Sequence, residues 1–154
     1  GTVEEGVRDL LASRAVAGTK VAWFERDHPS SWPAHSLGTL STHDLPTVMG
    51  ALEGTDPRPA DMSSRIRDLT GSESPDDATA TLVLAHRHLA DAGSDLVLAT
   101  AEDLVGSPRR VNLPGINDYP SWRSRLPVPV DALDGNPTAG AVSTLLAEAR
   151  PRSG

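Results

Sequence analysis

Three short apolar runs, separated by stretches with helical periodicity, constrain the fold more than any other feature of the chain. They lie at residues 20–24 (K-V-A-W-F), 36–42 (S-L-G-T-L-S-T) and 95–101 (D-L-V-L-A-T-A). Short runs of this kind are typical of strands buried on both faces, as in parallel sheets. The sequence therefore predicts an α/β fold with parallel strands.

Helical spacing of apolar residues predicts the elements between and around these strands. We expect helices at residues 4–16, 46–53, 61–69, 74–92 and 136–150. Ser74 and Pro75 form a typical helix start, with a capping hydroxyl followed by proline in the first turn. The proline-containing segments 25–35 and 106–135 are expected to be irregular.

Composition excludes several classes of protein. The 154 residues carry a formal net charge of −7 and no cysteine, which argues against a nucleic-acid partner, a disulfide scaffold and a thiolate zinc site. No apolar run approaches about 18 residues and no basic start leads into an apolar stretch, so we expect a cytoplasmic protein with no membrane partner. Because the first residue is Gly1 rather than Met, we expect a piece of something longer.

Acidic residues follow each of the three predicted strands. Glu25 and Asp27 come after the first, Asp44 after the second, and Glu102 and Asp103 after the third. In parallel α/β folds and (βα)₈ barrels, ligand chemistry gathers at the carboxyl ends of strands. The pattern predicts a carboxylate-lined site at this edge.

Three groups of segments, read in order, resemble the amylomaltases, which are 4-α-glucanotransferases. They are residues 1–8 (G-T-V-E-E-G-V-R) with 18–25 (G-T-K-V-A-W-F-E); residues 41–47 (S-T-H-D-L-P-T); and residues 102–104 (E-D-L) with 111–115 (V-N-L-P-G) and 119–123 (Y-P-S-W-R). The second block is fairly specific, and the third is specific when it occurs downstream of the second, as it does here. The resemblance covers residues 1 to about 127.

This resemblance implies the carboxyl-terminal part, about strands six to eight, of a catalytic (βα)₈ TIM barrel over residues 1–154, with a terminal proline-rich link and helix at 128–154. The family transfers α-1,4-glucan segments between maltodextrins with retention. A carboxylate attacks the anomeric carbon, a carboxylic acid protonates the leaving oxygen, and a sugar hydroxyl then displaces the enzyme. The implied partners are a maltodextrin or another α-1,4-glucan and the remaining half of the same barrel, with no cofactor.

The resemblance also assigns roles to individual residues. Asp44 matches the carboxylate that stabilises the transition state, and His43 matches a sugar-binding histidine beside it. Asn112 and Glu102 are candidates for substrate contact. The family's nucleophile and acid/base precede the matched segments, so we expect this chain alone to be inactive.

Other interpretations of the same residues remain open. Asp44 could be only a helix N-cap ahead of Pro46. The His43–Asp44 pair could belong to a helical metal phosphohydrolase, although the glycine and proline around it argue against a helix. The whole chain could be a non-catalytic half-barrel with a glucan-binding or structural role. Trp32 is a candidate for stacking on a sugar, whereas we expect Trp122 to be a packing anchor.

Overall fold

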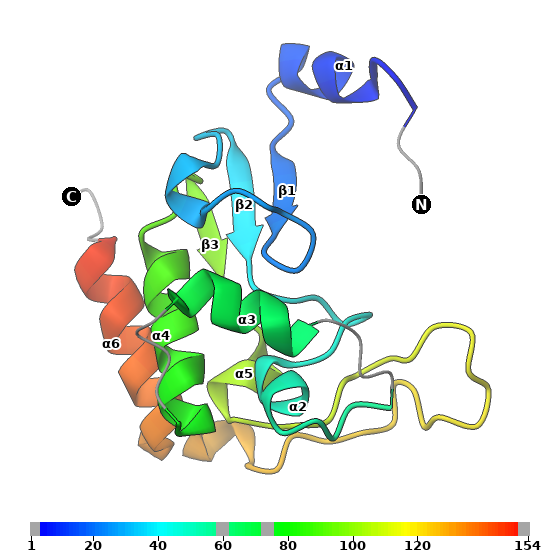
Figure 1. Cartoon of the computed structure of the whole chain (residues 1–154), viewed down its shortest axis with the longest axis vertical. Coiled ribbons are helices and arrows are strands. Elements are labelled where there is room, and N and C mark those ends of the chain that lie inside the picture. The colour runs from blue at the N-terminus through cyan, green and yellow to red at the C-terminus, as the bar shows by residue number, and fades with distance from the viewer. Residues whose placement is uncertain (1–3, 58–61, 72–75, 151–154) are drawn as a thin grey trace.

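The computed structural model describes residues 4–57, 62–71 and 76–150, and Figure 1 shows the arrangement of the elements. Three strands, β1 (Gly18–Val21), β2 (Ser36–Thr39) and β3 (Leu96–Leu98), alternate with helices. The helical elements are α1 (Val7–Ser13), η1 (Pro29–Ser31), α2 (Val48–Leu52), α3 (Met62–Thr70), α4 (Ala78–Ala90), α5 (Ala101–Leu104), η3 (Val130–Gly135) and α6 (Pro137–Ala149).

The strands form one parallel sheet in the order β1-β2-β3. Gly18 pairs with Ser36, and Leu37 pairs with Leu96, so the three strands are aligned in sequence order. The connection from β2 to β3 contains α2, α3 and α4. The predicted α/β class with parallel strands is therefore confirmed, and the carboxyl ends of all three strands point toward α2 and α5 (Figure 1).

Burial differs between the central strand and the two outer strands. β2 is buried along most of its length, as predicted for a strand covered on both faces. In β3, however, Leu96 is 57% and Leu98 54% exposed, and in β1 only Val21 is buried. The expectation of full burial was wrong for β3, because the face that carries Leu96 and Leu98 is not covered within the described residues. The first strand lies earlier than predicted, at Gly18–Val21 instead of 20–24; within the predicted run Val21, Ala22 and Trp23 are buried, whereas Phe24 is 70% exposed.

The hydrophobic core lies between β2 and the helices α2, α3 and α4. Leu40, Val48, Ile66, Leu82 and Leu89 are almost completely buried there. The helix α6 packs against α4 on the far side, and its buried residues are Ala139 and Val142. By contrast α1 has no buried residue and stands apart at the start of β1 (Figure 1).

The predicted helices are all present; α1, α2, α4 and α6 are shorter than predicted, whereas α3 ends at Thr70, one residue beyond the predicted end. The described start of α4 differs from the expected one: Asp77 is its N-cap, accepting hydrogen bonds from the backbone N–H groups of Thr79 and Ala80. The predicted cap Ser74 and Pro75 lie outside the described residues. Within the part of the chain that the structure describes, no helix is long and apolar enough to cross a membrane.

Candidate functional site

The turn that follows β2 presents His43 and Asp44 to solvent. Their side chains are 55% and 47% exposed, and His43 Nε2 lies 3.4 Å from Asp44 Oδ1. The next helix, α2, is capped by Thr47, whose hydroxyl accepts a hydrogen bond from the backbone N–H of Gly50. The interpretation of Asp44 as the helix N-cap was therefore wrong, and its carboxylate is available at the surface of the turn.

Asn112 meets Asp44 from the segment that follows β3. Its side-chain amide Nδ2 donates a hydrogen bond of 2.6 Å to Asp44 Oδ1, and its backbone N–H donates one of 3.0 Å to the carbonyl of His43. Residues 68 positions apart in sequence thus form one cluster at the carboxyl ends of β2 and β3. The structure brings together three of the four residues that the sequence analysis singled out.

A buried ion pair fixes this cluster to the body of the protein. Arg110 donates two hydrogen bonds of 2.7 Å to the two carboxylate oxygens of Asp56, and both side chains are almost fully buried. A third nitrogen of Arg110 donates to the backbone carbonyl of Asp44 at 3.3 Å. One guanidinium therefore ties the end of α2, the Asp44 turn and the segment after β3 together.

Close contact between α2 and the same segment supports this arrangement. Gly50 lies so near Pro108 that a Cβ on Gly50 would collide with the Pro108 carbonyl oxygen. Only glycine lets the two backbones approach this closely. Sequence reasoning gave no role to Arg110, Asp56 or Gly50, because their contacts cross from one loop to another.

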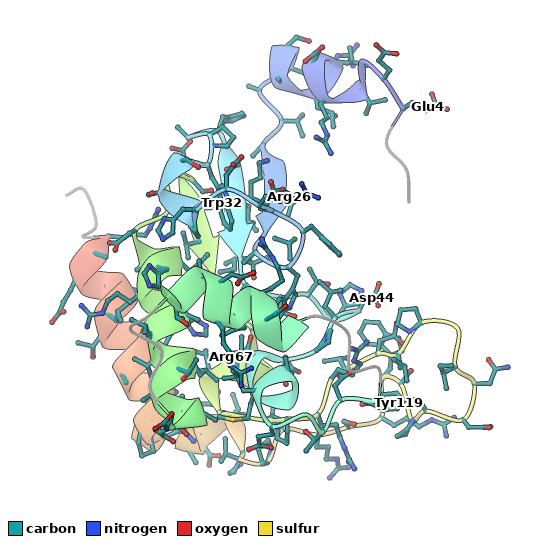
Figure 2. All side chains as sticks on the ribbon, in the orientation of Figure 1. Glu4, Arg26, Trp32, Asp44, Arg67 and Tyr119 are labelled. Atoms are coloured by element: carbon teal, nitrogen blue, oxygen red, sulfur yellow. The ribbon has the colours of Figure 1, made fainter. Side chains whose placement is uncertain are left out.

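Trp122 completes the exposed edge of the cluster. Its ring centroid lies 5.0 Å from that of His43, with the two planes tilted by 44°. Its side chain is 65% exposed, so the expectation that Trp122 anchors its segment by packing was wrong. Near it, Tyr119 donates from its hydroxyl to the carbonyl of Arg110 at 2.8 Å; Figure 2 labels Asp44 and Tyr119 on this side of the molecule.

Glu102 lines a cavity of about 240 Å³, together with Ser107, Arg109, Val111 and Arg125. Val111 directly precedes Asn112, but His43, Asp44 and Asn112 do not themselves line this cavity. Glu25 and Asp27 line a different cavity.

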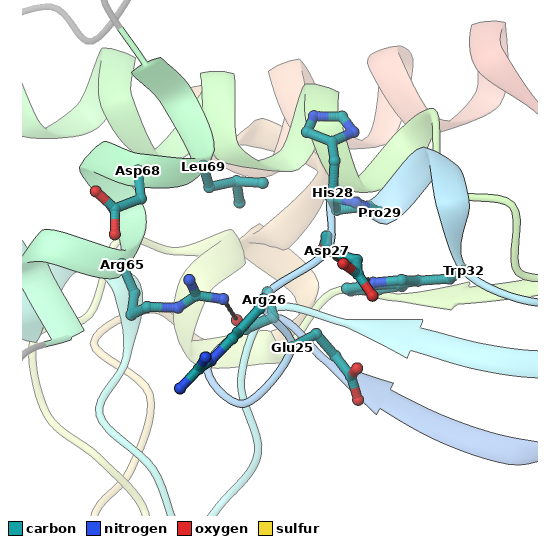
Figure 3. Close-up of a pocket in the computed structure, with 10 residues that line it drawn as sticks. Glu25, Arg26, Asp27, His28, Pro29, Trp32, Arg65, Asp68 and Leu69 are labelled. Atoms are coloured by element: carbon teal, nitrogen blue, oxygen red, sulfur yellow. Dashed lines mark hydrogen bonds between the residues drawn. The ribbon is translucent and has the colours of Figure 1, made fainter.

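The residues after β1 form a second, smaller hollow, shown in Figure 3. It has a volume of about 90 Å³ and is lined by Glu25, Arg26, Asp27, Arg65 and Trp32, among others. Trp32 is only 4% exposed and its ring N–H donates to the carbonyl of Asp27. Trp32 was predicted as a candidate for sugar stacking, but its ring is enclosed by protein and its role is packing.

A second histidine and aspartate, His86 and Asp103, are completely buried where α4 and α5 meet the core. Asp103 accepts hydrogen bonds from the backbone N–H of Val48 at 2.8 Å and from the hydroxyl of Thr100 at 2.9 Å. Burial raises the pKa of Asp103, and burial lowers the pKa of His86, which makes a 2.9 Å hydrogen bond with the carbonyl of Leu82. These groups belong to the interior and are not available to a ligand.

His86 and His88 lie two residues apart in α4, on different sides of the helix, so they cannot both bind one metal ion. His88 in α4 lies against His28, with 3.0 Å between His28 Nε2 and His88 Nδ1. Over residues 4–57, 62–71 and 76–150 no group of three or more His, Asp or Glu residues is arranged to hold a metal ion. His43 and Asp44 lie in a turn rather than in a helix, unlike the pair in a helical metal phosphohydrolase.

The fold is therefore α/β, with exposed His43 and Asp44 and a partly exposed Asn112 beyond the carboxyl ends of its parallel strands. A sequence family described as 4-alpha-glucanotransferase matches residues 1–131. The chain belongs to this family, as the sequence analysis predicted.

Individual relatives agree with this assignment. The chain is 33% identical to 4-alpha-glucanotransferases of Mycobacterium tuberculosis and Mycobacterium bovis over 89% of its own length. It spans 23% of the length of these relatives.

Solved structures show the same fold. The amylomaltase from Corynebacterium glutamicum superposes with a TM-score of 0.76 at 26% identity, covering 95% of this chain and 27% of the other. The amylomaltase from Streptococcus agalactiae in complex with acarbose gives a TM-score of 0.72 at 18% identity, covering 97% of this chain and 30% of the other. At that identity the second likeness concerns the fold alone.

Proposed function

We propose that these residues form the carboxyl-terminal part of a (βα)₈ barrel in a 4-α-glucanotransferase that transfers α-1,4-glucan segments between maltodextrins. Three observations support the barrel. The strands are parallel and follow one another in sequence order, helices lie in the β2–β3 connection, and the uncovered Leu96 and Leu98 of β3 are apolar. A closed barrel would cover these side chains and pair the open edges of β1 and β3. In this proposal residues 128–154 are the terminal link and helix of the same barrel.

The observation that carries the proposed activity is the exposed cluster of Asp44, His43 and Asn112 in a chain of this family. In a glycosyl transfer the anomeric carbon gains positive charge as its bond to the leaving oxygen breaks. The Asp44 carboxylate stabilises that charge, and His43 and Asn112 hold hydroxyl groups of the same sugar. Glu102, which lines the 240 Å³ cavity, is a further candidate for substrate contact.

The two reacting carboxyl groups are supplied, in this proposal, by barrel strands outside these 154 residues. A retaining mechanism requires a nucleophile and an acid/base about 5–5.5 Å apart. Asp103 cannot be one of them because it is fully buried and its oxygens accept hydrogen bonds from Val48 and Thr100. We therefore expect no turnover by the 154 residues alone, and we place the complete enzyme in the cytoplasm.

The test is intact mass of the protein purified from its source, combined with a maltotriose disproportionation assay on the same sample. A mass several-fold above 16.2 kDa with longer maltodextrins formed supports the proposal. A protein of that larger mass without transfer activity refutes it. A mass near 16.2 kDa with glucan binding but no turnover would instead indicate the non-catalytic half-barrel.

A further inference from the structure

We propose that Trp122 is a stacking platform for a glucose ring of the bound glucan, next to the ring held at Asp44. The proposal rests on the proposed function and adds a residue to the same site. Of the three tryptophans in the chain, Trp23 and Trp32 are 5% and 4% exposed, whereas Trp122 is 65% exposed. An indole with this much of its surface exposed to water needs an explanation, because burial of an aromatic ring is strongly favourable.

Hydrogen bonds hold Ser121 and Trp122 next to residues 111–113. The backbone N–H of Trp122 donates to the carbonyl of Val111 at 2.9 Å. The hydroxyl of Ser121 accepts from the backbone N–H of Leu113 at 3.2 Å. Because residues 111–113 flank Asn112, which is bonded to His43 and Asp44, the position of Trp122 is fixed relative to the Asp44 carboxylate.

The backbone of Trp122 is held in an unfavourable conformation. Its φ angle is +63°, in the left-handed region that bulky side chains rarely adopt. Ala15 is the other non-glycine residue with a positive φ among the described residues. Strain of this kind persists where the surroundings impose it, and it is concentrated at binding sites. Here it turns the indole toward His43, whose ring lies 5.0 Å away.

The chemistry of the cluster matches a sugar ring on two sides. A glucose unit carries hydroxyl groups around its edge and C–H groups on its faces. Asp44 and Asn112 offer a carboxylate and an amide to hydroxyl groups, while the Trp122 ring offers a flat apolar surface with a negative π face to the C–H groups. His43 lies between them, 3.4 Å from the Asp44 carboxylate and in ring contact with Trp122. An α-1,4-glucan that places one unit at Asp44 can therefore place its next unit on Trp122.

The experiment compares the natural enzyme with Trp122→Ala, Trp122→Phe and the control Ile116→Ala. Ile116 is an exposed apolar residue of the same loop, 43% exposed, and it carries no ring. Binding of maltoheptaose and acarbose is measured by calorimetry. The emission of the wild type minus that of Trp122→Phe isolates the fluorescence of Trp122, and its quenching by acrylamide is followed with and without sugar.

We expect Trp122→Ala to weaken maltoheptaose binding roughly tenfold, and Trp122→Phe to keep most of the affinity because a smaller ring still stacks. Ile116→Ala should bind as the wild type does. Trp122 fluorescence should be quenched readily in the free enzyme and protected by the sugar. The two fluorescence measurements need no Ala variant, so they test the proposal even if Trp122→Ala fails to fold.

Three results would overturn the inference in distinguishable ways. If the wild type binds no glucan, the proposed function fails together with the inference. If it binds glucan while Trp122→Ala binds equally well and Trp122 gains no protection, the inference alone is wrong. If Trp122 resists acrylamide before sugar is added, another part of the protein or a second copy covers the ring, and the exposed surface is not a sugar platform.

Discussion

The molecule contains two histidine–aspartate pairs whose surroundings differ completely. His43 and Asp44 lie in the turn after β2 with about half of each side chain exposed, 55% and 47%. His86 and Asp103 lie in the interior with no exposed surface. Both pairs consist of the residue types used in acid–base catalysis, so residue type alone does not separate them.

The difference shows how burial and partners decide what such a pair can do. The oxygens of Asp103 are occupied by the backbone N–H of Val48 and the hydroxyl of Thr100, so this carboxyl joins α2 to α5. Asp44 also has partners, His43 and Asn112, but its exposed part faces solvent and a ligand can reach it. We therefore expect substitutions in the buried pair to change stability and substitutions in the exposed pair to change activity.

The largest expected effect is on activity, from Asp44→Asn in the natural enzyme. Asparagine keeps the shape and loses the charge that stabilises the transition state. By analogy with lost transition-state donors, kcat should fall about 10²–10³-fold, or about 3–4 kcal/mol. The transfer assay measures this fall, and the thermal midpoint should stay within about 1 °C because the side chain is exposed.

The matched control for this prediction is Asp118→Asn, an exposed carboxylate in the loop that precedes Trp122. It should leave kcat unchanged. Equal turnover in Asp44→Asn and the wild type would show that the exposed pair has no role in catalysis.

Asp103→Ala should have the next largest effect, this time on stability. It leaves the buried N–H of Val48 without its acceptor and opens a small cavity, at a cost of about 2–4 kcal/mol in the free energy of unfolding. Asp103→Asn should cost less, because its amide oxygen can still accept that hydrogen bond. Urea unfolding measures both, and a loss of transfer activity without a loss of stability would contradict the structural role.

The pH dependence of stability should reveal His86. Burial lowers its pKa below the ordinary 6.5, so below pH 6.5 the unfolded chain binds a proton that the folded chain does not. His86 therefore makes the free energy of unfolding fall as pH falls, by at most about 1.4 kcal/mol per pH unit. Asp103 acts in the opposite sense, because its raised pKa lets the folded chain take up a proton first.

A comparison of variants separates the two contributions. Unfolding of the wild type and of His86→Leu should be measured between pH 7.5 and about 5. The decline should be smaller in His86→Leu. An identical decline in His86→Leu and the wild type would show that another group causes it.

Much of the fold could be predicted from the sequence because its signals are local. Apolar runs marked the three strands, and helical spacing marked the helices to within a few residues. The exposure of Leu96 and Leu98 could not be predicted in this way, since it depends on what covers their face of the sheet. The N-cap of α4 was predicted at Ser74, which lies outside the described residues, and the structure has Asp77 in that role through contacts with Thr79 and Ala80.

The site shows the same division between local and long-range information. Asp44, His43 and Asn112 lie in recognisable motifs, and the structure brings them together. Arg110 and Asp56 are 54 positions apart, and no local pattern connects them. The exposure of Trp32 and of Trp122 is the opposite of what their predicted roles require, because the exposure of a tryptophan in an irregular segment depends on how the loop folds back.

The smallest expected effect is that of Asn112→Ala, which tests the contact between the turn after β2 and the segment after β3. Asn112→Ala removes the 2.6 Å hydrogen bond to Asp44 Oδ1 but keeps the backbone bond to His43. A partly exposed hydrogen bond to a carboxylate contributes about 1 kcal/mol, so kcat/KM for maltotriose should fall about fivefold with little change in stability. Asn117→Ala, an exposed asparagine in the same loop, is the control and should be neutral. If Asn112→Ala instead lowers stability and leaves kcat/KM unchanged, this hydrogen bond stabilises the loop and does not contribute to sugar binding. The exposed pair would then have a structural role like that of the buried pair.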